Sequence, residues 1–198
     1  MRWSSAIMES RSGGGRFMNN DNTGLILWFT GLSGAGKTTT ARALLEPLRA
    51  SGARVELLDG DELRSIISRG LGFSREDRLE NIRRIIYISK LLARNGVIVM
   101  VSAITPYREM RELARRELPG FVEVFVDCPL SECERRDVKG LYAKARKAEI
   151  QHFTGIGDPY ELPEHPDIVI RTHTQDVESN VSMLLDYISL RLERSDAV

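Results

Sequence analysis

The sequence predicts a doubly wound α/β domain, in which helices cover both faces of a parallel sheet. Short apolar runs rich in β-branched residues alternate along the chain with longer amphipathic stretches. Strands that are apolar on both faces are typical of a parallel sheet covered on each side. A glycine-rich stretch also lies between the first apolar run and the first amphipathic one, as in a strand–turn–helix unit that binds phosphate. We therefore expect about five parallel strands joined by crossover helices.

The individual elements follow from the periodicity of apolar residues. Strands are expected at residues 25–30, 54–58, 97–101, 122–126 and 168–170. Helices are expected at residues 38–50, 76–95, 107–117 and 177–194. The second helix carries a broad apolar stripe, made of Leu79, Ile82, Ile85, Ile86 and Leu91. Gly52 and Gly96 are expected to end the first two helices.

Length and charge limit the possible partners. The chain has 198 residues, with 28 Lys and Arg against 28 Asp and Glu. Because this balance produces no overall field, we expect neither nucleic acid nor membrane as a partner. No apolar run approaches the ~20 residues that a membrane-spanning helix needs.

The N-terminal segment differs from the rest in composition. Residues 1–23 are rich in Ser, Gly and Asn, which predicts a disordered tail before a domain at 24–198; a short docking peptide is the alternative. Its apolar stretch is too short and interrupted for a secretory signal. Cys128 and Cys133 are the only cysteines and have no second pair with which to form a zinc site. We interpret them as reduced structural residues of a cytoplasmic protein.

The glycine-rich stretch matches the phosphate-binding motif G-x-x-x-x-G-K-S/T. Glycines allow backbone N–H groups to turn toward phosphate oxygens, and the following helix directs its positive dipole end at them. The alternative is a glycine-rich turn with an incidental lysine, but the flanking strand and helix favour nucleotide binding. The predicted ATP-binding residues are Gly31, Leu32, Ser33, Gly34, Ala35, Gly36, Lys37, Thr38 and Thr39.

Side chains at the end of the second expected strand predict an acceptor site. The chain lacks the guanine-reading sequences N-K-x-D and T-K-x-D, which counts against a GTPase. Asp59 and Asp61 follow the strand, where a doubly wound sheet opens toward its ligand. Asp61 can orient a substrate hydroxyl and contact Mg²⁺, and Arg64 can hold an anion. The alternative is that both aspartates only cap the next helix.

Residues 72–84 predict a second part of the acceptor site. Ser74 and Asp77 resemble a capping box, so a helix is expected to begin there. Arg78 and Asn81 then share one polar face, with Phe73 at its entrance. An aromatic ring, a guanidinium group and an amide suit a purine together with a phosphate or sulfate.

A long basic connection completes the pattern. Residues 135–166, called the lid segment below, carry several lysines, arginines, glycines and prolines without a clear strand. Such a connection inside a compact domain predicts a mobile lid that closes over phosphates. A solvated helix at about residues 139–150 is compatible with a lid and is also the simpler alternative to it.

Several motifs occur in the order and at the intervals found in adenylylsulfate kinases, and the resemblance runs from about Gly24 to near the C-terminus. They are residues 31–39, Asp59-Gly60-Asp61-x-x-Arg64, Gly72-Phe73-Ser74, Asp77-Arg78-x-x-Asn81-Ile82-Arg83-Arg84, Pro106-Tyr107-Arg108, Lys139-Gly140-Leu141-Tyr142 and Phe153-Thr154-Gly155-Ile156. The family transfers phosphate from MgATP to the 3′-hydroxyl of adenosine 5′-phosphosulfate, and its members are commonly homodimers.

The resemblance implies roles for individual residues. Catalysis would involve Lys37, Asp61 and Thr105, and Mg²⁺ would be bound by Thr38 and Asp61. The substrate would be bound by Asp61, Arg64, Phe73, Arg78, Asn81, Ile104, Thr105, Lys139 and Phe153.

Two positions depart from the family pattern. Thr105 replaces the usual serine, which in some members is assigned as a phosphorylated intermediate; we expect direct transfer, with Thr105 only lining the site. Gly157 stands where aspartate is frequent, next to the predicted lid. A kinase acting on a sugar acid or an antibiotic remains one alternative function. A catalytically idle nucleotide-binding partner of a sulfurylase is the other, although intact Lys37 and Asp61 argue against it.

Overall fold

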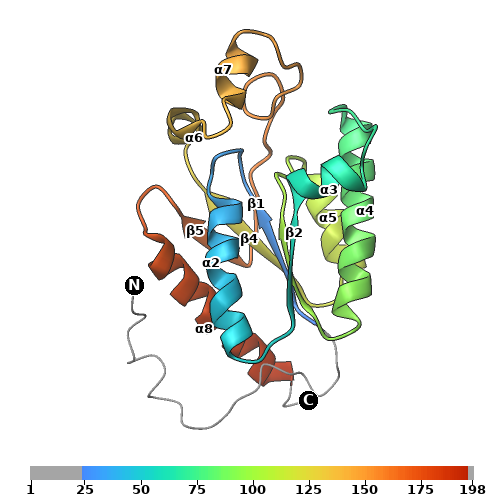
Figure 1. Cartoon of the computed structure of the whole chain (residues 1–198), viewed down its shortest axis with the longest axis vertical. Coiled ribbons are helices and arrows are strands. Elements are labelled where there is room, and N and C mark those ends of the chain that lie inside the picture. Colours follow the sequence, from blue (N-terminus) through green and yellow to red (C-terminus); the bar gives the residue numbers. More distant parts are fainter. Residues whose placement is uncertain (1–23, 196–198) are drawn as a thin grey trace.

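The computed structural model describes residues 24–195, so the predicted tail at 1–23 lies outside the described residues. Five parallel strands form one sheet with the order β2-β3-β1-β4-β5 (Figure 1). Their bounds are Ile26–Thr30 (β1), Val55–Asp59 (β2), Ile98–Ser102 (β3), Phe121–Asp127 (β4) and Ile168–Arg171 (β5). The predicted parallel sheet is therefore confirmed, with strand ends shifted by one residue in most cases.

The described part of the chain has seven helices, six between strands and α8 after β5: α2 (Lys37–Ala50), α3 (Gly60–Ile66), α4 (Arg75–Ala93), α5 (Arg108–Glu117), α6 (Leu130–Arg136), α7 (Leu141–Arg146) and α8 (Val177–Ser195). The four long ones coincide with the predicted helices. No pattern in the sequence predicted α3 or α6 as separate helices, and α7 lies within a broader stretch that was predicted as helix. These three helices have six or seven residues, too few for a hydrophobic period to be recognised.

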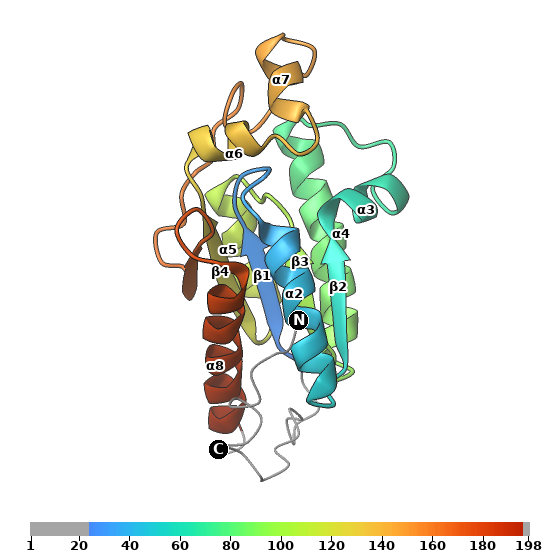
Figure 2. The same cartoon turned by 60° about the vertical axis from the view of Figure 1, so that its left-hand side comes forward.

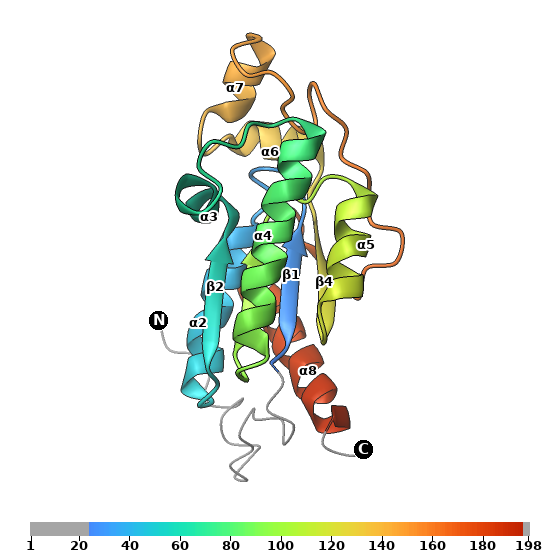
Figure 3. The ribbon, with the colours of Figure 1, turned by 90° about the vertical axis from the view of Figure 1, so that its right-hand side faces the viewer.

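Two apolar cores lie on the opposite faces of the sheet. Alternate side chains of β1 enter each core: Leu27 and Phe29 face one, and Ile26 and Trp28 face the other. Helices α2 and α8 cover the first face, and α4 and α5 cover the second (Figures 2 and 3). Both faces of β1 are thus buried, which explains why its sequence is apolar without alternation.

The site is located by the point where the strand order reverses. β1 lies between β3 and β4, so the chain leaves β1 at the switch point of the sheet, where α/β proteins bind ligands. Because the strands are parallel, the loops that follow β1, β2 and β3 all emerge at the same edge of the sheet, which is formed by the carboxyl ends of the strands. The α6–α7 segment lies beyond this edge, at the top of Figure 1.

Local signals at the start of α4 act as predicted. The Ser74 side chain accepts a hydrogen bond from Asp77 N, at 3.1 Å. The Asp77 carboxylate accepts one from Gly72 N, also at 3.1 Å, and so fixes the chain before the helix. This capping box sets the direction in which the first turn of α4 presents its side chains.

None of the helices that the structure describes combines the length and the apolar character needed to cross a membrane.

Candidate active site

The loop between β1 and α2 has the geometry of a phosphate-binding turn. Gly36 is the N-cap of α2 with φ +102°, a left-handed conformation that glycine adopts without steric cost. A Cβ at Gly31 would lie 2.6 Å from the Val126 carbonyl oxygen, so only glycine allows this loop to pass β4. The predicted loop residues 31–36 therefore surround the N-terminus of α2, where N–H groups and the helix dipole favour an anion.

Lys37 closes this loop from inside. Its ammonium group donates to the carbonyl oxygens of Gly31, at 2.9 Å, and Leu32, at 2.7 Å. The residue is 8% exposed, and burial lowers the pKa of Lys37 to about 8, while the neighbouring Asp61 carboxylate partly opposes that shift. The lysine is thus held at the loop with fewer favourable contacts for its charge than water would offer.

Oxygen atoms suited to a magnesium ion meet beside Lys37. The Thr38 hydroxyl donates to Asp59 Oδ2, at 3.1 Å, and lies 2.8 Å from Ser102 Oγ. Asp59 also caps α3, because its Oδ1 accepts a hydrogen bond from Asp61 N. The capping alternative is therefore correct for Asp59, but the same carboxylate also contacts the predicted metal ligand Thr38. A hydroxyl and a carboxylate are the oxygen donors that Mg²⁺ prefers alongside phosphates.

Asp61 and Lys139 meet across the site. The Lys139 ammonium group forms an ion pair with Asp61 Oδ2, which joins the lid segment to the first turn of α3. Both side chains are more than half exposed. Asp61 therefore faces the space above the edge of the sheet, whereas Asp59 points back toward Thr38.

Two predicted arginines converge on Phe73. The guanidinium carbon of Arg64 lies 4.6 Å from the centre of the Phe73 ring, and that of Arg78 lies 5.7 Å from it. Phe73 is 50% exposed, so part of its surface remains open to a ligand. Burial lowers the pKa of both arginines, and Arg78 also disfavours the charge on Arg64. Two cations held close together favour an anion between or beside them.

Arg78 also ties α4 to the end of the lid segment. It donates to the Phe73 carbonyl oxygen at 2.9 Å, to Thr154 Oγ1 at 3.0 Å, and to the carbonyl oxygen of His152. Asp158 lies 3.6 Å from the same guanidinium group. Arg78 is only 7% exposed, so these contacts fix its orientation.

Asn81 lies one turn after Arg78 on α4 and is 6% exposed. Its side-chain oxygen is buried without a hydrogen-bond partner in the described structure. A buried unpaired acceptor is costly, which is consistent with the predicted role of Asn81 in holding a ligand.

Ile104 and Thr105 follow β3 at the carboxyl end of the sheet, and they take part in different hydrogen bonds. The Ile104 carbonyl accepts hydrogen bonds from Thr30 Oγ1 and from Gly31 N, which couples this turn to the phosphate loop. Thr105 is 2% exposed, and its hydroxyl accepts a hydrogen bond from Trp28 Nε1 at 2.9 Å. The Thr105 hydroxyl is therefore engaged by the core.

Phe153 belongs to the core of the lid segment. Its ring meets the Tyr142 ring edge-on, with centroids 4.9 Å apart, and it is only 8% exposed. Phe73 therefore offers more free ring surface than Phe153.

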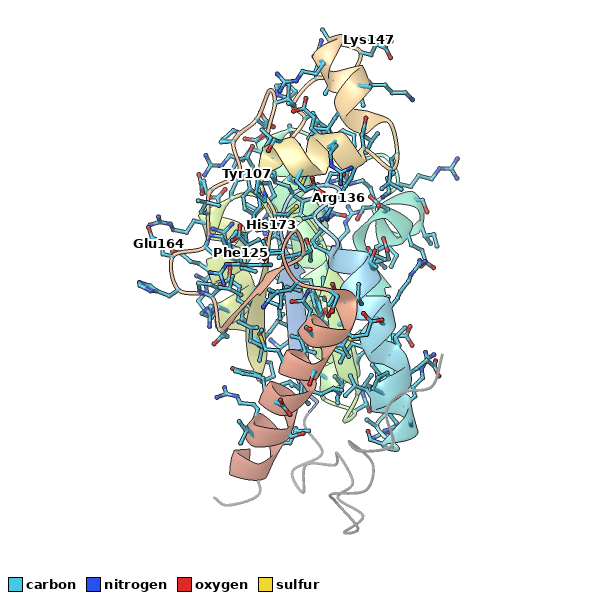
Figure 4. The ribbon with its side chains drawn as sticks, turned by 90° about the vertical axis from the view of Figure 1, so that its left-hand side faces the viewer. Tyr107, Phe125, Arg136, Lys147, Glu164 and His173 are labelled. Atoms are coloured by element: carbon cyan, nitrogen blue, oxygen red, sulfur yellow. The ribbon has the colours of Figure 1, made fainter. Side chains whose placement is uncertain are left out.

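A Cβ added at Gly157 would lie 3.7 Å from His152 N, which is an ordinary contact. The space around Gly157 therefore does not exclude the aspartate that is frequent at this position in the family. Lys147 lies at the far end of the lid segment (Figure 4).

Several residues at the site were not singled out from the sequence. Ser102 ends β3 beside Thr38. Near the phosphate loop, Arg136 donates a hydrogen bond of 2.8 Å to the Thr172 carbonyl oxygen. Thr172 in turn donates to the Ala35 carbonyl oxygen at 2.6 Å. The position of Ser102 at a strand end was a usable signal, whereas nothing local in the sequence places Arg136 or Thr172 at the loop.

The fold and this site define the class of phosphate-binding-loop kinases. The sequence profile of the adenylylsulphate kinase family matches residues 23–171. An adenylyl-sulfate kinase of Picosynechococcus sp. is 57% identical over 165 residues, covering 83% of this chain and 93% of the relative. The chain belongs to the adenylylsulfate kinase family.

Solved structures agree with this assignment. An APS kinase of Mycobacterium tuberculosis in complex with AMPPNP and APS superposes with a TM-score of 0.82 at 44% identity, covering 84% of this chain and 98% of that one. A gluconokinase of Sinorhizobium meliloti has a TM-score of 0.56 at 19% identity and covers 88% of this chain and 97% of its own, so that likeness concerns the fold alone.

The lowered pKa of Lys37 predicts how ATP binding depends on pH. Because phosphate favours the protonated amine, binding above pH 8 requires uptake of a proton, and the affinity falls by at most about tenfold per pH unit. Below the pKa it is flat with respect to this group. Titration calorimetry with a non-hydrolysable ATP analogue, in buffers of different ionisation enthalpy, measures both the affinity and the number of protons taken up on binding. Lys37→Arg, which keeps its charge, is expected to abolish the dependence; an equal dependence in this variant contradicts the assignment to Lys37.

Proposed function

We infer that this protein transfers the γ-phosphoryl group of ATP to the 3′-hydroxyl of adenosine 5′-phosphosulfate, forming 3′-phosphoadenosine 5′-phosphosulfate and ADP. Family membership supports this inference. The observation that carries it is the pairing of Asp61 with Lys139 above the phosphate loop, next to the cluster of Arg64, Arg78 and Phe73. This arrangement offers a triphosphate site, an exposed carboxylate paired with Lys139, and an anion site with an aromatic surface, all at the carboxyl ends of the strands.

The ATP half is built from the loop amides and Lys37. These donors surround the position of the transferred group and stabilise the negative charge that develops on its oxygens. Thr38 and Asp59 suit a Mg²⁺ ion by their chemistry, and Asp61 stays a predicted ligand. When bound, such an ion neutralises charge on the β- and γ-phosphates.

On the acceptor half, Asp61 aligns the ribose hydroxyl. A sugar hydroxyl is a far weaker acid than a carboxylic acid, so removal of its proton before attack is unfavourable. The carboxylate instead accepts the proton late, as the metaphosphate-like group is captured. Arg64, Arg78 and Lys139 hold the phosphosulfate, and the exposed Phe73 ring contacts the adenine.

The transfer is direct, without a phosphothreonine intermediate. A nucleophilic hydroxyl needs access to the phosphorus and a neighbouring base. The Thr105 hydroxyl is buried and already accepts the Trp28 N–H. Its only other contact that the structure describes is with the Ala103 carbonyl oxygen, at 3.4 Å, which is not a catalytic base.

The enzyme is proposed to be a cytoplasmic homodimer. Exposed apolar side chains on α3 and α4, Ile66 at 66% and Tyr87 at 65%, are available for contact with a second copy. Light scattering coupled to gel filtration measures the oligomeric state.

The cytoplasmic location is supported by Cys128 and Cys133, which are unpaired thiols, as is usual in reducing compartments. Burial raises the pKa of the Cys133 thiol to about 12.

The function is tested by ADP release from MgATP with different acceptors. We expect acceptor-dependent turnover with adenosine 5′-phosphosulfate and none with gluconate or aminoglycosides. Turnover with one of those acceptors instead would support the alternative small-molecule kinase. Binding of ATP without turnover on any acceptor would support an idle nucleotide-binding module.

Removing the Asp61 carboxylate is expected to affect chemistry more than binding. Asp61→Ala lowers kcat by about 10²–10⁴-fold, with the thermal midpoint little changed because the side chain is exposed. Glu62→Ala, at the next exposed position of α3, is the matched control and keeps the original kcat. An Asp61→Ala enzyme of full activity would exclude this role.

Rapid-quench experiments with γ-labelled ATP test direct transfer. No label is expected on the protein at any time during the first turnover. Thr105→Ser, which retains the hydroxyl acceptor for Trp28, is expected to keep kcat within about threefold. The proposal of direct transfer fails if phospho-Thr105 forms and decays at rates that match kcat.

A further inference from the structure

The turn that follows β3 is held in an unfavourable backbone conformation. Thr105 has φ +49°, in the left-handed region, where a β-branched residue is an outlier. Such strained residues persist only where the surrounding structure over-determines them. The turn therefore needs groups that hold it.

The contacts of the turn come from buried polar side chains. Trp28 Nε1 donates to the Thr105 hydroxyl, and Thr30 Oγ1 donates to the Ile104 carbonyl oxygen at 2.7 Å. Arg111 Nη1 donates to the Thr105 carbonyl oxygen at 3.0 Å. Each of these three donors lies on an element of the core, two on β1 and one on α5.

Arg111 is the charged member of this group and is almost fully buried. Its side chain is 4% exposed, and its Nε lies 3.0 Å from Oε1 of Glu123, which is 7% exposed. A buried ion pair is often no more stabilising than apolar side chains of the same size, so stability alone is a weak reason for it. The planar guanidinium group, however, can hold a carboxylate and a carbonyl oxygen in fixed directions at the same time.

The same cluster also holds the end of the lid segment. Tyr160 Oη lies 2.9 Å from Thr30 Oγ1, and the Tyr160 ring lies 6.0 Å from the Arg111 guanidinium carbon. Glu161 N donates to the Pro106 carbonyl oxygen at 2.8 Å. Tyr160 also stacks on Phe125 of β4, which is labelled in Figure 4 together with Tyr107 and Glu164.

We propose that Arg111 is a positioning residue for the acceptor half of the site. Arg111 fixes the Thr105 turn by its hydrogen bond to the Thr105 carbonyl oxygen. Through its contact with the Tyr160 ring, it also fixes the C-terminal end of the lid segment. This end of the segment includes Asp158, which pairs with Arg78. Ile104 and Thr105 then border the acceptor, and Arg78 keeps its orientation. Arg111, with its side chain only 4% exposed, would act through these groups rather than by touching the acceptor. This inference rests on the proposed function, because it assigns the turn to the binding of the sulfonucleotide.

The chain provides a matched control in Arg115, one turn further along α5. Arg115 contacts the other oxygen of Glu123, at 3.0 Å, and Asp167, also at 3.0 Å. Within residues 24–195 it makes no hydrogen bond to the Thr105 turn, and its side chain is 42% exposed. The two arginines thus share one carboxylate, but only Arg111 reaches the turn.

The test compares Arg111→Lys with Arg115→Lys in steady-state kinetics. A lysine keeps the charge beside Glu123 but lacks the fork that also reaches Thr105. We expect Arg111→Lys to raise KM for adenosine 5′-phosphosulfate by about tenfold and KM for ATP by less than about twofold. Arg115→Lys is expected to leave both constants within about twofold, and thermal melts report the stability of each variant.

A spectroscopic readout separates positioning from general loosening. The chain has two tryptophans, Trp3 and Trp28, so Trp3→Phe assigns the indole N–H resonance of Trp28. Because this N–H donates to Thr105, Arg111→Lys is expected to shift its resonance and Arg115→Lys to leave it in place. An unshifted resonance with unchanged KM in Arg111→Lys overturns the proposal, as does an equal rise of KM in both variants.

Failure of the proposed function would look different. The unsubstituted enzyme would then show no turnover of adenosine 5′-phosphosulfate, whatever the Trp28 resonance does in the two variants.

Discussion

The Lys37 ammonium group, held almost out of water by the carbonyl oxygens of Gly31 and Leu32, is the interaction on which the site depends. Burial disfavours its charge, so the loop gains most when phosphate oxygens supply the missing negative partner. The sheet makes this arrangement possible, because β1 lies at the switch point and its carboxyl end directs the loop toward the open edge. The strand, the glycines and the helix are each required to place one amine there.

The main features of the fold were predictable from the sequence because its strongest signals are local. The strands are apolar on both faces, and α4 begins at a capping box that Ser74 and Asp77 form as expected. The short helices α3 and α6 were not predicted, and α7 was predicted only as part of a longer stretch, because two turns are too few to show a hydrophobic period. The mobility of the lid segment stays a prediction.

The site was predictable where a motif fixes both residue type and spacing. Lys37, Arg78 and Asn81 follow from such motifs, and the structure brings them to one edge. It was less predictable where tertiary contacts decide the role. Asp59 both caps α3 and reaches Thr38, and the left-handed Thr105 accepts a hydrogen bond from Trp28, 77 residues earlier in the chain. Sequence patterns carry no record of which buried donor meets which carbonyl oxygen.

The pairing of Lys139 with Asp61 bears on how ATP is protected from hydrolysis before the acceptor binds. Ion pairs between exposed side chains are weak, so an incoming dianion can draw the lysine away at little cost. Until it does, the lysine occupies one oxygen of the carboxylate proposed to receive the hydroxyl proton. Water that enters beside bound ATP would therefore meet a carboxylate with one oxygen already paired, an arrangement that disfavours futile hydrolysis of the nucleotide when no acceptor is bound.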